Sequence, residues 1–296
     1  MRPCPACSSR HATTQGVVNG FEIVRCDGCR SLFTSRLPDA TSQFDYGGYY
    51  GPENLKIGEV VRSAAKTVLE ALPVRRTSGR FADLGFGGGA FLDAAKDAGW
   101  ETWGVEISES AIEAARRRGH HALGLEESES LPKDFDLIVA SEVVEHVASP
   151  TDLVSSAWRH LRPGGVLYLT TPCGDGLNAR LLGHRWSWVV APPEHLCIFS
   201  HAGIRQLLET VGFDVLQIRS TGLNPADAFD GAQVLLGIKK ESRRAPGQAS
   251  STSSVAINSA MSASALRRFA KRTANRVLGV LGFGDTLKAI ARKPEA

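Results

Sequence analysis

The 296-residue chain lacks any apolar run close to the roughly 18–20 residues that cross a bilayer, so the sequence predicts no membrane-spanning helix. Its opening residues, MRPCPACSSR, lack the apolar core of a secretory signal, which favours a cytoplasmic protein. In that reducing compartment the six cysteines are not expected to form disulfides. A composition of 43% hydrophobic and 22% charged residues excludes wholesale disorder and a coiled-coil rod, and indicates a sizeable globular core.

The chain also has little net charge, +3 at neutral pH, but this value is a cancellation between segments. Residues 1–36 carry +3, residues 37–238 carry −9 and residues 239–296 carry +9. A basic surface beside an acidic domain favours localisation or an anionic acceptor over duplex nucleic-acid binding by the whole protein.

Four of the cysteines are spaced as metal ligands, in two C-x2-C pairs separated by 18 residues. Between the pairs, Asn19-Gly20 is a hairpin-turn dipeptide, so a hairpin can bring both pairs to one tetrahedral zinc ion. A redox-active C-x-x-C is the alternative, although that motif comes singly and near a βαβ unit. We therefore predict a zinc ribbon over residues 1–40, with zinc held by Cys4, Cys7, Cys26 and Cys29.

The ribbon has few apolar residues, so zinc coordination is expected to supply most of its folding free energy. In the simplest interpretation, the zinc ribbon has a purely structural role. A ribbon that binds nucleic acid or a protein partner is the alternative, and scattered arginines without interleaved aromatic residues do not favour it.

From residue 59 the pattern alternates between helices and strands, which predicts a parallel sheet covered by helices on both faces. Gly99 and Gly119 are expected to end two helices, and Ser110 with Glu113 predicts a capping box at the start of the second one. The domain is expected to span residues 59–235. Its strands are predicted near residues 80–84, 100–106, 122–125, 135–140, 166–171 and 213–220, with helices at 59–71, after the glycine turn, before Gly119 and at 149–161.

Two segments interrupt this alternation. Residues 41–58 form a linker whose tyrosines, Tyr46, Tyr49 and Tyr50, could close over a cofactor or pack as ordinary linker residues. Residues 236–283 combine a Ser/Ala-rich linker with a basic amphipathic helix, inserted before a closing strand in residues 284–296. Such a helix can rest on an anionic membrane, dock an anionic acceptor or pack on the domain with its charges solvated.

The turn after the first strand reads Asp83-Leu84-Gly85-Phe86-Gly87-Gly88-Gly89. Glycines let the backbone approach a ligand closely, and the following helix offers its N–H groups. Glu106 ends the next strand, where it can accept hydrogen bonds from ribose hydroxyls. Because GFGGGA also satisfies G-x-G-x-x-A, these residues alone leave a nicotinamide cofactor open.

Three features together resemble the class I S-adenosylmethionine-dependent methyltransferases: the acid before the glycines, FDLIVASEVVEHV, and LRPGGVLYLTTP at residues 161–172. The resemblance covers roughly residues 60–235 and resumes at the closing strand. It implies a Rossmann-like α/β fold with a seven-stranded, mostly parallel sheet and helices on both faces, and S-adenosylmethionine as cofactor. The cofactor-binding residues that it implies are Asp83, Gly85, Gly87, Gly89 and Glu106, with Glu126 as the candidate near the adenine.

The segment EVVEHV offers groups for methyl transfer, in which the protein mainly aligns the acceptor and removes its proton. Glu142, Glu145 and His146 share one face if this turn is helical. Together with the later His195, the segment is similar to the ubiquinone-biosynthesis O-methyltransferases and the small-RNA terminal 2′-O-methyltransferases. That resemblance implies a second divalent cation, Mg or Zn, at these four residues. The alternative is a metal-free role for His146 or His195 as a base or pocket-lining residue.

Residues 177–196 occupy the place where this fold commonly has its acceptor-binding lid. Trp186 and Trp188, with Arg180 and Arg185, would suit an aromatic or anionic acceptor, or the tryptophans could plug the lid onto the core. The remaining cysteines, Cys173 and Cys197, are interpreted as ordinary pocket or core thiols.

The sequence therefore predicts a cytoplasmic methyltransferase with an amino-terminal zinc ribbon, acting on a hydroxyl of a small molecule, sugar or lipid-linked precursor. Peripheral contact with an anionic membrane is a further expectation. Sugar C-methylation and RNA 2′-O-methylation are the alternatives within the class. A nicotinamide-dependent oxidoreductase and a non-catalytic zinc-ribbon binding protein are the alternatives outside it.

Overall fold

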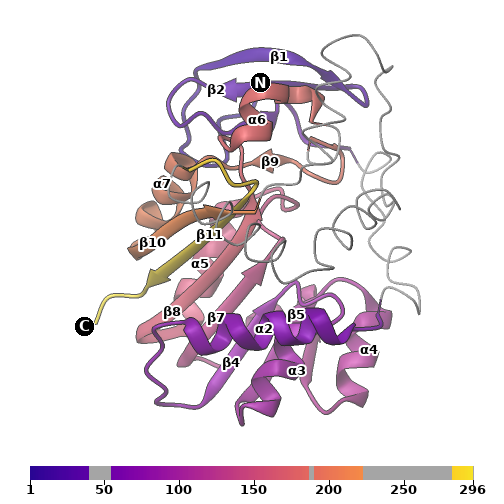
Figure 1. The fold of residues 1–296 in the computed structure, drawn as a ribbon, viewed down its shortest axis with the longest axis vertical. Helices are drawn as coiled ribbons and strands as arrows, with labels where there is room; N and C mark the ends of the chain where they lie inside the picture. The colour runs from indigo at the N-terminus through magenta and orange to yellow at the C-terminus, as the bar shows by residue number, and fades with distance from the viewer. Residues whose placement is uncertain (40–54, 187–189, 223–281, 296) are drawn as a thin grey trace, which may run out of the picture.

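The computed structural model describes residues 1–39, 55–186, 190–222 and 282–295. The predicted tyrosine cluster, Trp188 and the basic helix of the inserted segment lie outside the described residues. Figure 1 shows a large sheet in the body of the molecule and a smaller sheet at one end.

The large sheet has seven strands in the order β10-β11-β8-β7-β4-β5-β6. Strands β4 to β8 pair in parallel, whereas β11 runs antiparallel to both of its neighbours. This confirms the mostly parallel sheet and the antiparallel closing strand. The strands are β4 (Arg80–Leu84), β5 (Glu101–Glu106), β6 (His121–Gly124), β7 (Phe135–Ser141), β8 (Leu161–Pro172), β10 (Asp214–Thr221) and β11 (Thr286–Arg292).

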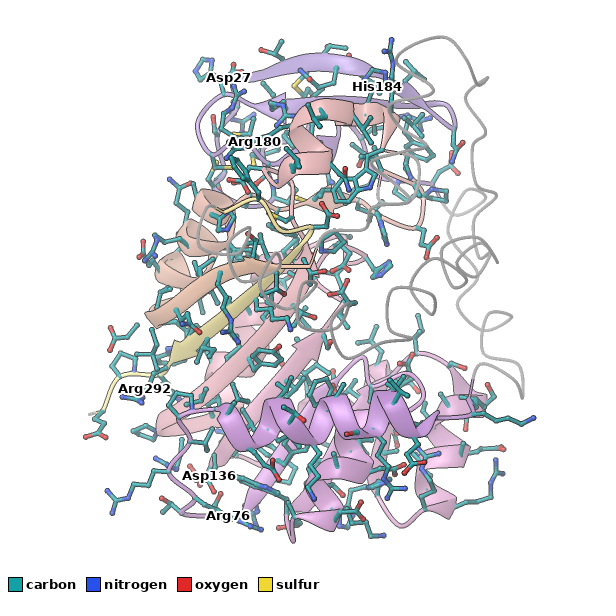
Figure 2. The ribbon with its side chains drawn as sticks, in the orientation of Figure 1. Asp27, Arg76, Asp136, Arg180, His184 and Arg292 are labelled. Carbon is teal, nitrogen blue, oxygen red and sulfur yellow. The ribbon has the colours of Figure 1, made fainter. Side chains whose placement is uncertain are left out.

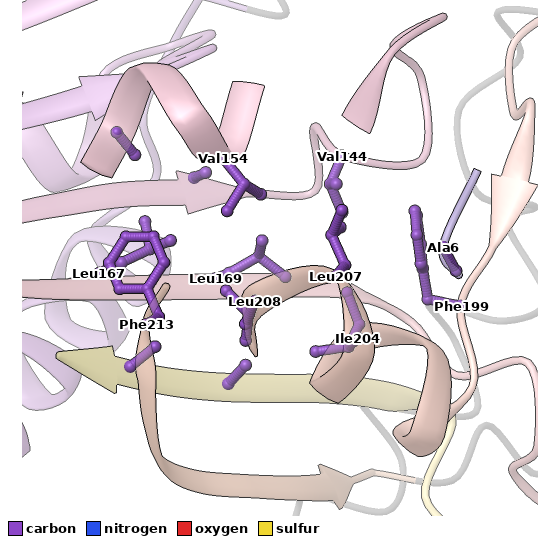
Figure 3. Packing of buried hydrophobic residues seen from close by; sticks show 14 of the residues in the cluster. Ala6, Val144, Val154, Leu167, Leu169, Phe199, Ile204, Leu207, Leu208 and Phe213 are labelled. Atoms are coloured by element: carbon purple, nitrogen blue, oxygen red, sulfur yellow. The ribbon is translucent and has the colours of Figure 1, made fainter. Parts of the chain in front are cut away.

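Both faces of this sheet are buried, because alternate residues of its strands enter two different hydrophobic clusters. In β7, Ile138 packs in the cluster that contains residues of α5 and α7, part of which is drawn in Figure 3. Its neighbour Leu137 packs in the cluster that contains residues of α3 and α4. The helices are α2 (Glu59–Ala71), α3 (Ala90–Asp97), α4 (Glu109–Arg117), α5 (Pro150–His160), α6 (Leu177–Leu182) and α7 (His201–Val211), with 3-10 turns η1 (Leu125–Ser130) and η2 (Gly183–Arg185).

The helix ends agree with the sequence-based predictions at two points and differ at one. Gly99 and Gly119 follow α3 and α4 with left-handed φ of 78° and 81°. In addition, the Ser200 hydroxyl caps α7. The predicted capping box is wrong, because α4 begins at Glu109 with Ser108 at its N-cap. Ser110 therefore lies in the first turn, where its hydroxyl contacts that of Ser108 at 2.9 Å.

The small sheet is the ribbon, built from β1 (Ala12–Val18), β2 (Phe21–Cys26) and β3 (Leu32–Thr34). Asn19 and Gly20, between β1 and β2, have left-handed φ of 49° and 78°, as a two-residue hairpin turn of type I′ requires. A fourth strand, β9 (Cys197–Ile198), pairs antiparallel with β3 although it comes from the chain that follows β8 of the large sheet. The ribbon and the core therefore share one sheet.

A third hydrophobic cluster joins the ribbon to the segment that follows β8. Trp186 is only 2% exposed and packs there with Ile23 and Leu32 of the ribbon. Trp186 is therefore a buried packing residue, as one interpretation expected, but it packs against the ribbon and not in either of the two clusters of the large sheet. Among the described helices, none combines the length and the apolar character that crossing a membrane requires.

Candidate functional site

The glycine turn joins β4 to α3 and needs glycine for two reasons. Gly85, Gly87 and Gly89 have φ of 72°, 51° and 83°, in the region that side chains with a Cβ rarely adopt. A Cβ on Gly85 would also lie 2.5 Å from Cγ2 of Val143, which belongs to the turn after β7. The glycine turn and the turn after β7 are therefore in close contact.

Asp83 lies at the end of β4, directly before this turn, and is only 2% exposed. Its Oδ1 has no hydrogen-bond partner among the described residues. Burial and the charge of Glu106 raise the pKa of Asp83 to about 8. An unpaired acceptor buried beside a glycine turn fits a ligand that brings a cation or an N–H donor, such as the amino group of S-adenosylmethionine.

Glu106 ends β5 and is 5% exposed. Its Oε2 accepts a hydrogen bond from the N–H of Gly87 at 2.8 Å, and its Oε1 accepts from Ile107 at 2.8 Å and Ser108 at 3.2 Å. The bond from Gly87 ties Glu106 to the glycine turn. A carboxylate has about four acceptor sites, so capacity remains for a ribose hydroxyl.

Two apolar residues at this edge were missed by the sequence reasoning. Ile107 and Leu125 are each 58% exposed, and they directly follow Glu106 and Gly124, which are paired on the adjacent parallel strands β5 and β6. Such a pair of exposed apolar side chains suits a flat purine. The available signal was an apolar residue immediately after the end of each strand. Glu126 is exposed on η1, one residue further along.

The turn after β7 is not helical, so its acidic and imidazole groups do not share a helical face. Glu142 has a left-handed φ of 56° and its N–H donates to the carbonyl of Thr170 at 2.9 Å. Backbone strain of this kind is concentrated at functional sites. Glu142 is exposed, but desolvation of its carboxyl by the surrounding protein still raises its pKa, and a hydrogen bond from Thr170 partly opposes the shift.

Glu145 is 1% exposed, and its Oε2 accepts a hydrogen bond from the Thr171 hydroxyl at 2.9 Å. Its Oε1 has no hydrogen-bond partner among the described residues and lies 3.8 Å from Nε2 of His146. Burial and the charge of Glu142 hold the pKa of Glu145 well above its ordinary value. A carboxyl in this setting favours its neutral form unless a cation joins it.

His146 is held by the carbonyl oxygen of Glu194, which lies 2.8 Å from Nδ1. Because a carbonyl only accepts, Nδ1 carries the hydrogen and Nε2 keeps the lone pair. The ring of His195 stands edge-on to that of His146, with centroids 4.6 Å apart. Burial and the neighbouring His195 lower the pKa of His146 to about 4, so the imidazole is neutral near pH 7.

One ligand atom each from Glu145, His146 and His195 lies within 4.8 Å of the others, whereas Glu142 lies outside this group. The structure therefore brings together three of the four residues that the sequence predicted as a metal site. Two imidazoles and a carboxylate match the donors preferred by zinc and similar transition metals. The same arrangement also presents the Nε2 lone pair as a proton acceptor.

The four ribbon cysteines form a compact cluster with all Sγ atoms within 4.8 Å. Sγ of Cys4 lies 3.6 Å from that of Cys29, and Sγ of Cys7 lies 3.5 Å from that of Cys26. Tetrahedral zinc with Zn–S bonds of about 2.3 Å places its sulfurs about 3.8 Å apart, so these thiols fit the ion. The contact with Cys4 lowers the pKa of Cys29 to about 5. The same contact and burial raise that of Cys4, so joint ionisation needs a cation.

The other two cysteines are buried. Cys197 belongs to β9 and is a core thiol, while Cys173 lies 3.3 Å from Oδ1 of Asp175. Cys173, Asp175 and His201 form a further group of metal-ligand type, which the sequence spacing did not reveal. Here Nδ1 of His201 already lies 2.8 Å from the Asp175 carboxylate. Burial raises the pKa of Cys173, so its thiol is not an activated nucleophile.

The segment expected to act as a lid faces the ribbon. His184 on η2 packs against β1, where a Cβ on Gly16 would meet its ring at 2.6 Å. Arg180 lies over the Phe283 ring at 5.2 Å and donates to the carbonyl of Asp175 at 2.6 Å. Figure 2 shows Arg180 and His184 on the ribbon side of the molecule, far from Arg76 and Asp136. Arg185 is exposed.

Comparison with known families finds a match over residues 57–218, more than half of the chain, to a family described as "Methyltransferase domain". The chain is 24% identical over 162 residues to a ubiquinone biosynthesis O-methyltransferase of Idiomarina loihiensis, covering 50% of this chain and 66% of that protein. It is 29% identical over 198 residues to a malonyl-[acyl-carrier protein] O-methyltransferase of Enterobacter lignolyticus, covering 64% of this chain and 76% of that protein. The chain thus spans just under two thirds of the length of the Idiomarina protein.

Among solved structures, a SAM-dependent methyltransferase from Archaeoglobus fulgidus superposes with a TM-score of 0.51 at 20% identity. The match covers 84% of this chain and all of that one. At this identity the likeness concerns the fold, and it agrees with the seven-stranded sheet described above.

Proposed function

Because the chain belongs to the class I S-adenosylmethionine-dependent methyltransferases, we propose that it methylates a hydroxyl of a small-molecule, sugar or lipid-linked acceptor. Family membership sets aside the nicotinamide-dependent oxidoreductase. The observation that carries the choice of a hydroxyl is the neutral His146, whose Nε2 lone pair adjoins Glu145 at the carboxyl end of β7. The curated relatives reported above, both O-methyltransferases by name, support the same choice.

We assign the cofactor to the edge formed by β4, β5 and β6. Asp83 would receive the amino group and Glu106 the ribose, while the glycine turn provides space for the methionine portion. Ile107 and Leu125 would flank the adenine, with Glu126 as the candidate polar contact. The cofactor supplies a methyl group already activated on a sulfonium, so the remaining work concerns the acceptor.

The low pKa of His146 leaves two possible roles for the cluster of Glu145, His146 and His195. An imidazole with a pKa near 4 is a weak base for a phenol of pKa about 10. The difference of about six pKa units makes the proton transfer unfavourable by roughly 8 kcal/mol. The cluster could overcome this gap by holding a divalent cation, which lowers the pKa of a bound hydroxyl. In the metal-free version, His146 accepts the proton as the methyl group transfers, with Nδ1 held by Glu194.

The test is methyl transfer from radiolabelled S-adenosylmethionine to fractionated cell extract, separated into small molecules, RNA and protein. We expect label in the small-molecule or lipid fraction, lost in His146→Ala and retained in His11→Ala, an exposed ribbon histidine. S-adenosylhomocysteine should bind both variants equally. Label in RNA or protein alone would reject the proposed acceptor class, and label on carbon would identify C-methylation.

Treatment with a chelator distinguishes the metal-assisted role of the cluster from its metal-free role. If transfer persists after chelator treatment while one zinc per chain remains on the ribbon, the metal-assisted version is wrong. If transfer stops and returns on adding Mg²⁺ or Zn²⁺, the metal-free version is wrong.

The predicted membrane contact rests on the basic segment 236–283 and is tested separately. We expect the full chain to bind vesicles that contain phosphatidylglycerol at low salt and to dissociate at high salt. Absence of binding at low salt would exclude that contact.

A further inference from the structure

Leu196 connects the turn after β7 to the zinc ribbon. Its N–H donates to the carbonyl of Glu145 at 2.7 Å, and its own carbonyl accepts from the N–H of Thr34 at 3.1 Å. Leu196 directly follows His195 in the chain. A single residue therefore joins the candidate acceptor site on one side and β3 of the ribbon on the other.

Arg2 adds a second connection at the same place. Its Nη2 donates to the carbonyl of Leu196 at 2.8 Å and its Nε to the carbonyl of Thr34 at 2.9 Å. Its Nη1 lies 3.5 Å from the carbonyl of Ala148, two residues beyond His146. One planar guanidinium thus reaches the ribbon, the segment of His195 and the turn after β7. A lysine ammonium has neither the fork nor the span to replace it.

The other end of the His195 segment is also held by the ribbon. Nδ2 of Asn19, in the β1–β2 turn, donates to the carbonyl of Pro192 at 2.8 Å. The N–H of His195 in turn donates to the carbonyl of Ala191 at 3.2 Å. The ribbon therefore contacts this segment both before and after the histidine.

The zinc-ligand cluster itself borders the core. The carbonyl of Cys29 accepts a hydrogen bond from the Ser200 hydroxyl, and the Ser200 N–H donates to the Ser31 hydroxyl at 3.1 Å. Cys4, Cys26 and Cys29 belong to the same hydrophobic cluster as Cys197 of β9. The four-cysteine cluster therefore lies directly against β9 and the Ser200 backbone.

The cofactor edge differs in this respect among the described residues. There, no hydrogen bond or ion pair joins residues 1–38 to Asp83, to the glycine turn or to Glu106. In the described part of the chain, the hydrogen bonds from residues 1–38 to the site therefore lie in its acceptor half.

We propose that the zinc ribbon forms one side of the acceptor half of the site. Arg2 and Asn19 of the ribbon are positioning residues that hold Glu194 and His195 against His146. This inference rests on the acceptor role proposed for His146 and His195. It predicts that loss of the ribbon contacts disturbs the histidine pair and leaves cofactor binding intact.

The test compares Arg2→Ala, Arg2→Lys and Asn19→Gly with Arg10→Ala. Glycine suits the left-handed backbone of Asn19, so Asn19→Gly removes only the side-chain contact with Pro192. Arg10 is exposed and makes no hydrogen bond with the described residues, which makes it the matched control. Three readouts are used: histidine Cε1–H resonances, hydrogen exchange of the Leu196 amide, and calorimetry with S-adenosylhomocysteine.

In Arg2→Ala we expect shifted resonances of His146 and His195 and at least about tenfold faster exchange at Leu196. Arg2→Lys should resemble Arg2→Ala, Asn19→Gly should show a smaller effect, and Arg10→Ala none. The dissociation constant for S-adenosylhomocysteine should stay within about twofold of the unsubstituted protein, and the zinc content should not change.

Unchanged histidine resonances and unchanged Leu196 exchange in Arg2→Ala and Asn19→Gly would overturn the proposal. An equal loss of cofactor affinity in Arg2→Ala would also overturn it, because the ribbon would then support the whole fold. Should Arg2→Ala fail to fold, Asn19→Gly carries the test. These readouts need no turnover, so a finding that His146→Ala methylates normally would reject the proposed acceptor chemistry separately.

Discussion

Nδ1 of His146 lies 2.8 Å from the carbonyl oxygen of Glu194, 48 residues later in the chain. This contact decides which nitrogen of the ring carries the hydrogen, so that Nε2 keeps its lone pair. It also makes the geometry of the site depend on the segment that enters the ribbon sheet.

Replacement of His146 by alanine should lower the rate of methyl transfer by roughly 10²–10⁴-fold, because the Nε2 lone pair is lost. The affinity for S-adenosylhomocysteine should not change, since the residue lies outside the cofactor edge. The measurements are initial rates and calorimetry, with His11→Ala as the control. An undiminished rate would remove His146 from the chemistry.

The same histidine predicts a pH dependence of stability. Its pKa in the folded protein is about 4, below the unfolded value of about 6.5, so the unfolded state binds more protons between these values. The contribution of His146 is thus present above pH 6.5 and is lost as the pH falls towards 4. Urea unfolding from pH 7 to 4 should be less pH-dependent in His146→Gln, by a modest amount because the side chain is 19% exposed.

For Asp83 we expect the opposite dependence of stability on pH. Its folded pKa of about 8 lies above the ordinary value of 3.8, so the folded state binds the extra proton between these values. The protonated Asp83 carboxyl therefore makes its full contribution to stability below pH 3.8, and this contribution is lost as the pH rises through 8. Asp83→Asn should raise the free energy of unfolding at pH 8 by roughly 2–5 kcal/mol and should weaken cofactor binding.

Ligand binding offers an independent check on Asp83. If the carboxyl ionises when it pairs with an amino group, S-adenosylhomocysteine should release a proton on binding at pH 6–7. Calorimetry in two buffers of different ionisation enthalpy measures that proton. Identical enthalpies in both buffers would contradict the proposed role.

Gly85→Ala should destabilise the protein by more than the roughly 1–2 kcal/mol expected from a left-handed backbone alone, because the new Cβ would meet Val143. Gly20→Ala is the matched control, since Gly20 has a similar φ and, among the described residues, no atom lies within 4 Å of the added carbon. Adding Val143→Ala to Gly85→Ala should recover part of the loss in urea unfolding. No recovery would show that the contact with Val143 is not the cause.

Cys26→Ser should abolish zinc binding to the ribbon and lower stability by several kcal/mol, since the ion and the ribbon fold together. Trp186 packs against the ribbon and is 2% exposed, so its fluorescence should shift to the red when zinc is lost. Metal analysis, and comparison with Trp186→Phe, check both statements. Cys173 lies outside the ribbon, so the Cys173→Ser variant should keep the ribbon zinc. Equal zinc content in Cys26→Ser and Cys173→Ser would refute the assignment of the ligands.

The local features of this fold were accessible from the sequence because each depends on a few neighbouring residues. Asn19-Gly20 predicted a hairpin turn and Gly99 a helix end, since both positions require a left-handed backbone. The glycines after Asp83 predicted a tight turn at the end of a buried strand. The prediction of the capping box was also wrong for a local reason. Serine is a favourable N-cap residue at both position 108 and position 110, and the sequence pattern alone did not distinguish them.

The candidate site was predicted in part. Glu145, His146 and His195 meet as the resemblance implied, whereas Glu142 lies outside the group because the turn after β7 is not helical. Ile107 and Leu125 were missed because neighbouring strand ends become one surface only when β5 and β6 pair. No local pattern contains that pairing.

Residue spacing along the chain was sufficient for the cysteine pairs, the glycine turn and the alternation of strands and helices, because φ preferences and the periods of buried residues act over a few positions. Spacing was insufficient for the addition of β9 to the ribbon sheet, for the burial of Trp186 and for the contacts of Arg2 with Leu196. Those depend on which distant segments bury apolar surface and satisfy backbone hydrogen bonds together, and these are conditions that the folded chain meets as a whole.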